Sequence, residues 1–468
     1  MIKWLEDAVF YEVYPQSFRD SNGDGIGDIP GITEKLEYIQ ELGCNALWIN
    51  PCFTSPFYDA GYDVEDYYSV APRYGTNEDL KQLFEEAHKK GIHVLLDLVP
   101  GHTAVTHPWF QESMKAEKNE YTDRYVWTDS LYKRMEDVKG IVSVLRGISP
   151  RPASCGVNCF STQPALNYGF ANITDAGWQQ PTDAPGPMAT REELKNIMRF
   201  WLTLGCDGFR VDMAGSLVKN DEDKKETIRL WQDVRAFLNK EFPEAALVSE
   251  WGKPEVALEA GFDMDFYLHF GDTGYMDLFR GDHPYFGGDP ESDISVFAGI
   301  FAKNQENLRG KGMMCMPSGN HDMARISYQL DEEQMRLAYG FIYGFPGAPF
   351  LYYGDEIGMQ GYRDPFNRAY FDWNSTERRL RVPLTNLARL RRSCDAFDGG
   401  SMELVEASAD VLHYRRVGKE QSAEIILNNG PHLIVRTAFG KQTEVNPGGF
   451  TILVEDNQPQ HVGYFKYY

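Results

Sequence analysis

Short apolar runs alternate with longer amphipathic segments from the start of the chain to Cys394. Runs such as 45–50 (NALWIN) and 93–99 (HVLLDLV) are almost continuously apolar, as strands are when both faces of their sheet are covered. Segments such as 77–91 and 191–205 place apolar residues at intervals of three and four, which predicts helices. About eight strand–helix units of this kind predict an α/β fold, a parallel (β/α)8 TIM barrel.

The predicted barrel strands are 9–15, 45–50, 93–99, 207–212, 245–250, 264–268, 313–318 and 349–353. The predicted helices are 33–43, 77–91, 191–205, 222–240 and 332–343.

Two stretches depart from this rhythm. Roughly ninety residues rich in Pro, Gly, Asn and Thr follow the third predicted strand, and a structureless loop of that size is improbable in a compact domain. Beyond Cys394, short β-branched runs separated by Gly, Asn or Pro predict an antiparallel β-domain. The expected domains are a catalytic barrel at 1–102 and 170–394, an inserted subdomain at 103–169, and a C-terminal β-sandwich at 395–468.

Composition and charge exclude some classes of partner. The 468-residue chain has 42% hydrophobic residues, and 46 basic against 69 acidic residues give it a net charge of −23. Because such a chain repels phosphate backbones, no nucleic-acid partner is expected. No apolar run is long enough to span a membrane, no signal peptide is visible, and the seven cysteines are scattered and odd in number. These features predict a reduced, cytoplasmic protein without a membrane partner.

Polar residues gather where the predicted strands end. Barrel active sites lie at the carboxyl ends of the strands, so residues there are the first candidates for catalysis. A single residue of this kind at a strand end is typical of a helix cap, a turn residue or a packed histidine. Together, three carboxylates from three different strands, Asp212, Glu250 and Asp322, would meet at one mouth. The candidates at these ends are Asp97, His102, Arg210, Asp212, Glu250, His321 and Asp322.

Several of these segments resemble the α-amylase family of glycoside hydrolases. GFRVD (208–212), the Glu250 that ends the fifth strand, NHD (320–322), DLVPGH (97–102) and PGAPFLYYGDEIGM (346–359) are similar to that family's signature segments. The expected order of barrel, insertion and β-domain is also the order of domains in that family. The resemblance covers nearly the whole chain.

The resemblance implies a role for each of the three carboxylates. Asp212 would be the nucleophile, Glu250 the general acid/base and Asp322 the stabiliser of the transition state. Cleavage of a glycosidic bond with retention needs one carboxylate to attack C1 while a carboxylic acid protonates the leaving oxygen, and the two groups lie about 5–5.5 Å apart. The resemblance thus implies a reaction that passes through a covalent glucosyl-enzyme intermediate.

The resemblance also implies which residues bind the sugar. Arg210 would keep the nucleophile ionised, while His102 and His321 would bind hydroxyl groups and Tyr62 would stack on the sugar ring. In members that resemble oligo-1,6-glucosidases, an Asp at the position of Asp59 binds the terminal glucose. Its partner Arg would be Arg368, and a pair between these two residues would wall off the site and favour attack at the chain end. A surface salt bridge of little energetic weight is the alternative for this pair.

Departures from the family pattern limit the choice of reaction. Gly215 and Ser216 stand where endo-acting amylases place Lys-His, and Gly101 stands where many have a calcium-binding Asn. Met213 occupies a position that helps to select the linkage, and it is neither of the usual residues there. We therefore expect an exo-acting α-glucosidase type that hydrolyses α-1,4 and/or α-1,6 bonds in short α-glucans. The alternatives are an endo-acting α-amylase, an α-glucan transglycosylase, and a non-catalytic sugar-binding or partner-binding relative.

The stretch DSNGDGIGD (20–28) has the composition of a cation site. It lacks an EF-hand's entering helix, and Gly31 stands where an EF-hand has its bidentate Glu. It resembles the loop that follows the first barrel strand in oligo-1,6-glucosidase-like enzymes. That resemblance implies a structural Ca2+, with Mg2+ as the alternative, and a solvated acidic turn is the competing interpretation. The implied ligands are the side chains of Asp20, Asn22, Asp24 and Asp28 and the carbonyl of Ile26.

Overall fold

The structure is a computed structural model of the chain. It describes residues 2–267, 274–289, 291–308, 310–375, 380–457 and 465–467, without the side chains of Asn307 and of 465–467. The last residue of the predicted strand 264–268 lies outside the described residues.

Eight parallel strands close into a barrel, which confirms the predicted fold. Around the ring the order is β1, β12, β11, β10, β9, β8, β5 and β2, and every neighbouring pair is parallel. Apolar side chains of these strands are buried almost completely, because the barrel interior covers one face and the helices the other. The strands are β1 (Phe10–Val13), β2 (Ala46–Ile49), β5 (His93–Leu98), β8 (Gly208–Val211), β9 (Ala246–Ser249), β10 (Met264–Phe266), β11 (Met313–Pro317) and β12 (Ala348–Tyr352).

Helices follow the barrel strands along the chain, and they differ from the prediction in two ways. The segment 33–43 is split between α2 and α3 because Lys35, at φ −103° and ψ 4°, leaves helical geometry. Helices α1, α8, α9 and α11 were not predicted; α8 has six residues, too few to display a helical period. The helices are α1 (Pro15–Phe18), α2 (Ile29–Glu34), α3 (Leu36–Glu41), α4 (Asn77–Lys89), α6 (Pro185–Leu204), α7 (Lys225–Glu241), α8 (Pro254–Glu259), α9 (Ser295–Leu308), α10 (Glu332–Gly344) and α11 (Arg381–Ser393).

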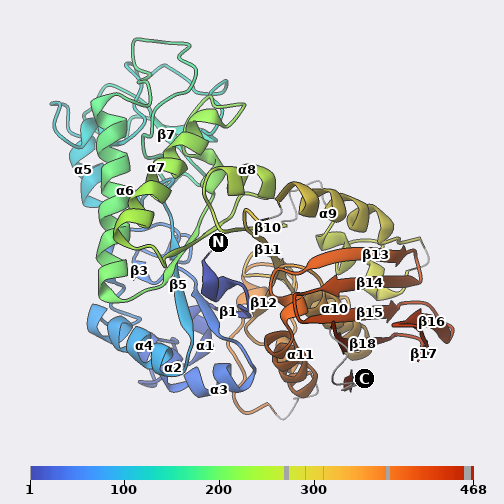
Figure 1. Cartoon of the computed structure of the whole chain (residues 1–468). Helices are drawn as coiled ribbons and strands as arrows, with labels where there is room; N and C mark the ends of the chain where they lie inside the picture. The colour runs from blue at the N-terminus through green and yellow to red at the C-terminus, as the bar shows by residue number, and fades with distance from the viewer. Residues whose placement is uncertain are drawn as a thin grey trace.

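The long segment between β5 and α6 carries structure of its own. It contains α5 (Pro108–Ser113) and an antiparallel pair, β6 (Ser143–Leu145) and β7 (Cys155–Val157). In Figure 1 this segment, in teal to green, projects beyond the barrel next to α6 and α7. A backbone bridge between His102 and Ala165 ties the segment to the end of β5, so it borders the mouth of the barrel. A separate small core holds it together: Val126, Met135, Val138, Ala165 and Phe170.

The C-terminal part forms an antiparallel sheet of five strands beside α10 and α11 (Figure 1). A two-stranded hairpin stands where a second sandwich sheet was expected. Gly340 and Gly344 of α10 let the sheet approach closely, because a Cβ on either would lie 2.7 Å from the Phe450 ring or the Tyr414 hydroxyl. The sheet contains β13 (Ser401–Ala407), β14 (Val411–Val417), β15 (Gln421–Asn428), β18 (Gly449–Asp456) and β19 (Phe465–Tyr467), and the hairpin β16 (Ile434–Ala438) and β17 (Lys441–Val445).

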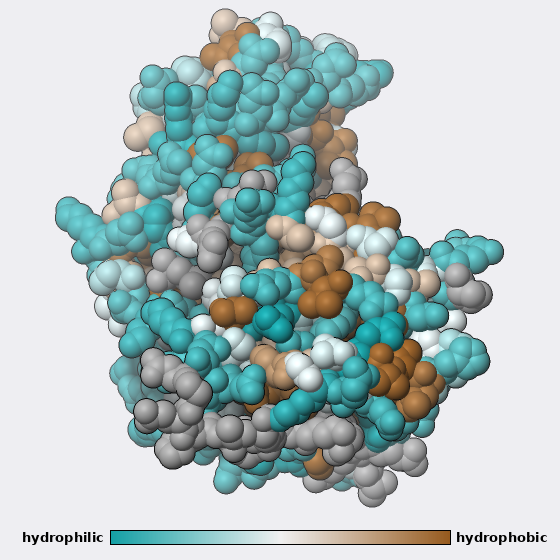
Figure 2. Space-filling view, turned by 45° about the vertical axis from the view of Figure 1, so that its right-hand side comes forward, coloured by the Kyte–Doolittle hydropathy of each residue, from teal (hydrophilic) through white to brown (hydrophobic). Residues whose placement is uncertain are grey.

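The surface agrees with the acidic, polar composition. The face in Figure 2 is mostly hydrophilic, with hydrophobic residues in small separate patches. None of the helices in the described part of the chain is long and apolar enough to cross a membrane.

Candidate active site

The buried guanidinium of Arg210, on β8, connects carboxylates from three neighbouring strands. Its Nη1 lies 2.9 Å from Oδ1 of Asp97 and 3.1 Å from Oδ1 of Asp212, and its Nη2 lies 2.9 Å from Oε2 of Glu250. Parallel strands end at the same side of a barrel, so residues distant in sequence meet there. The structure thus brings together the predicted nucleophile, the predicted acid and the predicted arginine.

Asp212 and Glu250 form a pair of carboxyl groups that are only 11% exposed. Burial, the charge of Glu250 and a hydrogen bond with Glu250 raise the pKa of Asp212 well above its usual value, and Arg210 opposes them. Each of two adjacent buried carboxylates opposes the ionisation of the other. The charge of Arg210 favours the ionised form of Asp212.

A strained backbone positions Glu250. Met213, directly after Asp212, has a left-handed φ of 44°, which is uncommon for a residue other than glycine. In this conformation its N–H donates to Oε2 of Glu250 over 3.0 Å. Oε2 of Glu250 thus contacts both Met213 and Arg210, and Oε1 contacts neither of these two donors.

Asp322, which follows β11, has a more open side chain, 40% exposed, and cationic neighbours. Its Oδ1 lies 3.1 Å from Nη2 of Arg368, and its Oδ2 lies 3.3 Å from Nε2 of His321. Burial acts to raise the pKa of Asp322, but the charges of His321, Arg368 and Arg210 outweigh it and lower the pKa below its usual value. This third carboxylate is therefore ionised more readily than Asp212.

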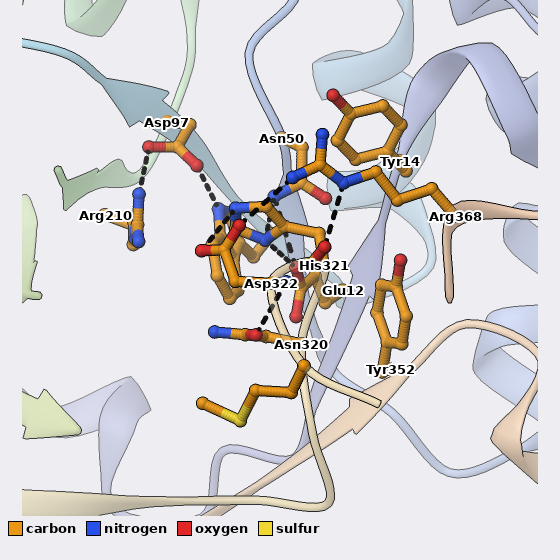
Figure 3. A network of polar contacts seen from close by, with 12 residues as sticks. Glu12, Tyr14, Asn50, Asp97, Arg210, Asn320, His321, Asp322, Tyr352 and Arg368 are labelled. Atoms are coloured by element: carbon orange, nitrogen blue, oxygen red, sulfur yellow. Dashed lines mark hydrogen bonds and ion pairs between the residues drawn. The ribbon is translucent and has the colours of Figure 1, made fainter. Parts of the chain in front are cut away.

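His321 and Tyr62 stack on each other inside the mouth (Figure 3 shows His321 and its polar neighbours). Their ring centroids are 5.2 Å apart, and the Tyr62 hydroxyl lies 2.6 Å from Nε2 of His321 and 2.9 Å from Oδ2 of Asp97. On the other side of the ring, Nδ1 lies 2.8 Å from Oε1 of Glu12. Both residues predicted to touch the sugar are thus held by a buried polar network.

His102 lies beneath the mouth and is almost fully buried. Its Nε2 donates to the carbonyl of Tyr62 over 2.9 Å, and its Nδ1 accepts from the amide of Asn158 over 3.0 Å. Asn158 fits here because Gly101 has no side chain: a Cβ at Gly101 would lie 2.6 Å from Nδ2 of Asn158. Burial lowers the pKa of His102 to about 4, so the ring is neutral at neutral pH.

Asp59 and Arg368 both reach the mouth, but each has a different partner from the one anticipated. Nε2 of Gln163, in the inserted segment, donates to Oδ2 of Asp59 over 2.6 Å. Within the described residues, Arg368 pairs with Asp322 and with Asp364 rather than with Asp59. Burial raises the pKa of Asp59 to about 6, partly offset by the hydrogen bond from Gln163.

The loop 20–28 folds as a series of turns that its own side chains hold. Asp20 accepts from the N–H groups of Asn22, Gly23 and Gly25, and Asp24 accepts from that of Ile26. Oδ1 of Asp28 caps α2 at Gly31 N, and its Oδ2 accepts from Ser21. Carboxylate, amide and carbonyl oxygens are the donors that Ca2+ prefers. Among the described residues, however, three acidic, His or Cys side chains nowhere converge on one point that could hold a metal.

Sequence reasoning missed several residues that hold the site together. Glu12, a charged residue inside the apolar strand β1, and Asn50, directly after β2, are buried polar residues, and these positions were a usable signal. Gln163 and Asn158 gave no signal, because they lie in the irregular inserted segment. Trp251 packs on Gly215, where a Cβ would lie 2.5 Å from the indole Nε1.

Comparison with known proteins agrees with this geometry. The family model described as "Alpha amylase, catalytic domain" matches residues 12–395. Alpha-amylase 3 of Dictyoglomus thermophilum is 32% identical over 387 residues, which are 79% of this chain and 68% of that protein. Oligo-1,6-glucosidase of Parageobacillus thermoglucosidasius is 31% identical over 396 residues, again 79% and 68% of the two chains.

The solved structure of an α-amylase from H.orenii superimposes with a TM-score of 0.79, covering 96% of this chain and 99% of that one at 26% identity. The chain therefore belongs to the α-amylase family of glycoside hydrolases.

Proposed function

We propose that this enzyme is a retaining glycoside hydrolase that removes glucose from the ends of short α-glucans by cleaving α-1,4 and/or α-1,6 bonds. The observation that carries the proposal is the convergence of Asp212, Glu250 and Asp322 at one end of the barrel, with Arg210 and His321 bonded to them. It is the arrangement of charged groups that cleavage through a covalent glucosyl intermediate requires.

This reaction requires one proton on the Asp212–Glu250 pair, and that proton has to lie on Glu250. Glu250 would donate it from Oε1 to the leaving oxygen, while Asp212 attacks C1 from the other face of the sugar. Glu250 would then take a proton from water as that water releases the sugar from Asp212. Asp322, with its lowered pKa, would supply negative charge next to the oxocarbenium-like transition state.

Two features support attack at the chain end. The carboxylate of Asp59, fixed by Gln163, can accept hydrogen bonds from the hydroxyls of a terminal glucose. At Gly215 the Trp251 indole fills the space in which an endo-acting relative would carry a lysine. Both features favour a short substrate over an internal segment of a long one.

Maltoheptaose labelled at its reducing end tests the proposal. Glucose should be the first and only unlabelled product, and the labelled chain should shorten one residue at a time. A spread of mid-length products would overturn exo action in favour of an endo-amylase or a transglycosylase. If Asp212→Asn and Glu250→Gln left the activity unchanged, the catalytic assignment itself would fall.

We also propose that loop 20–28 binds a structural Ca2+ and that the enzyme works in the cytoplasm. The oxygen donors of Asp20, Asn22, Asp24, Asp28 and Ile26 support the first proposal. The seven free cysteines, which are typical of a reducing compartment, support the second.

A further inference from the structure

The strongest unexplained feature near the site is a buried carboxylate on β1. Glu12 is 1% exposed and lies 309 residues away in sequence from the histidine that it contacts. Its Oε1 accepts from Nδ1 of His321 over 2.8 Å and from the amide of Asn50 over 3.2 Å. Figure 3 shows Glu12 beside His321, with Asp322 next to it along the chain. The carboxylate is too deep to contact the reacting bond, so any effect on catalysis has to pass through His321.

The hydrogen-bond partners around His321 favour protons on both of its ring nitrogens. Nδ1 lies 2.8 Å from Oε1 of Glu12 and 3.1 Å from Nδ2 of Asn50, and a proton on Nδ1 would donate to the carboxylate, which also accepts from Asn50. The Tyr62 hydroxyl has a single proton, and it donates this proton to Asp97 over 2.9 Å. A second proton, on Nε2, would donate to the Tyr62 oxygen, 2.6 Å away. In a neutral ring with its proton on Nδ1, the lone pair of Nε2 would face both the Tyr62 oxygen and Asp322. Alternatively, Tyr62 would donate its proton to Nε2 and no longer to Asp97.

We propose that Glu12 is a positioning residue that holds His321 as an imidazolium, so that the ring's positive charge faces Asp322 and keeps it ionised. The inference rests on the proposed hydrolase function for its meaning in catalysis. Its structural content, the charge on His321, does not depend on any activity.

The charges around His321 are consistent with an imidazolium. Carboxylates contact both ring nitrogens, Glu12 at Nδ1 and Asp322 at Nε2. Burial acts to lower the pKa of His321, but Asp322 and Glu12 outweigh burial and Arg210, and the pKa is raised above its usual value. The titratable and charged groups that face this ring or its backbone are Glu12, Tyr14, Tyr62, Asp97, Arg210, Asp322 and Arg368.

The Glu12→Gln substitution removes the acidic group of residue 12 but keeps the size and shape of its side chain. The amide oxygen of Gln can still accept the Nδ1 proton, but it no longer stabilises the positive ring. Glu356→Gln is the matched control, since Glu356 is equally buried and bonded to Tyr11 and Tyr38 over 2.7 and 2.8 Å. Both variants replace one buried carboxyl group by an amide, but only the first changes a partner of His321.

Nitrogen-15 NMR of histidine-labelled enzyme reports the charge directly, with the His321 signals assigned from their loss in His321→Gln. In the wild type both ring nitrogens should show the shifts of an imidazolium at pH 7. In Glu12→Gln the midpoint of the titration should fall by about one pH unit or more, while Glu356→Gln should leave it in place. A neutral His321 in the wild type would overturn the proposal even if Glu12→Gln did not fold.

The pH dependence of kcat/KM then tests the link to catalysis. Glu12→Gln should keep most of its activity at acid pH and lose it progressively as His321 loses its proton, so the alkaline limb moves to lower pH. A uniform loss at every pH would show a merely structural role and would contradict the inference. If the wild type itself does not hydrolyse α-glucans, the proposed function fails, and the NMR result still decides the state of His321.

Discussion

Nη1 of Arg210 lies 2.9 Å from Oδ1 of Asp97 inside the barrel, where both side chains are at most 2% exposed. The same guanidinium also reaches Asp212 and Glu250, so one cation neutralises part of the charge of three buried carboxyl groups. Arg210 therefore stabilises the fold as well as the site.

Replacement of Arg210 by Met should lower the free energy of unfolding by about 3–5 kcal/mol, because it leaves buried carboxylates without their partner. Urea denaturation at neutral pH measures the change. Arg336→Met is the control, since Arg336 is 44% exposed and, among the described residues, forms an ion pair with Glu332 on the same helix. It should cost about 0.5 kcal/mol or less. Equal losses in the two variants would refute the role given to Arg210.

Arg368 should control the acid limb of the pH–rate profile. It is one of the charges that hold the pKa of Asp322 low, so in Arg368→Gln that pKa should rise. Asp322 would then be protonated at a higher pH, and the acid limb of kcat/KM should move upward in pH. Arg363→Gln, which removes a nearby arginine that stacks on Tyr362, should leave the limb where it is. An unshifted limb in Arg368→Gln would contradict this account.

Asp59 should lower the free energy of unfolding at neutral pH, although its carboxylate favours substrate binding. Burial raises its pKa to about 6 from a usual 3.8, so the folded protein binds more protons than the unfolded chain between these values. Its contribution to stability therefore falls as pH rises through that window, and it stays unfavourable above it. Asp59→Asn should raise the melting temperature at about pH 8 and change it little at about pH 4.

The same Asp59→Asn variant should have a higher KM for maltose and maltotriose, because it loses the carboxylate that accepts hydrogen bonds from the terminal glucose. Calorimetry and initial rates on one preparation measure both effects. A variant that is no more stable at high pH than at low pH, or one that keeps its KM, would show that Asp59 does not have the role proposed here.

Removal of calcium should affect stability more than chemistry. A ligand present at about 100 times its Kd stabilises the folded state by about 2.7 kcal/mol, so a chelator should lower the melting temperature by several degrees. Turnover measured well below the melting point should persist. In Asp24→Asn the effect of the chelator should shrink, while Asp223→Asn, an exposed acid 73% accessible in its side chain, should respond like the wild type. Immediate loss of turnover in folded protein would instead place the ion in the reaction.

Much of the barrel could be predicted because its strands carry a strong local signal. A strand covered on both faces, such as 93–99, must be apolar almost throughout, and this is visible without any partner. The short helix α8 and the break at Lys35 were missed, because six residues show no clear period and a single change of φ and ψ leaves no mark on the pattern.

The candidate carboxylates could also be located in advance, because the carboxyl ends of parallel strands have to meet. Their electrostatic states could not. The raised pKa of Asp212 comes from burial beside Glu250, and the lowered pKa of Asp322 comes from the adjacent His321 and from Arg368 and Arg210 on other segments. Such effects depend on distances of a few ångströms between groups that are far apart in the chain.

The sequence by itself determined the barrel, the order of its domains and the residue types at the strand ends, because those depend on local hydrophobicity and on the topology of parallel strands. Only the tertiary structure decided the partners: Gln163 rather than Arg368 for Asp59, and Glu12 for His321. These contacts join residues separated by 104 and 309 positions. Hydrogen bonds and charge interactions depend on position in space, which no local pattern in the chain records.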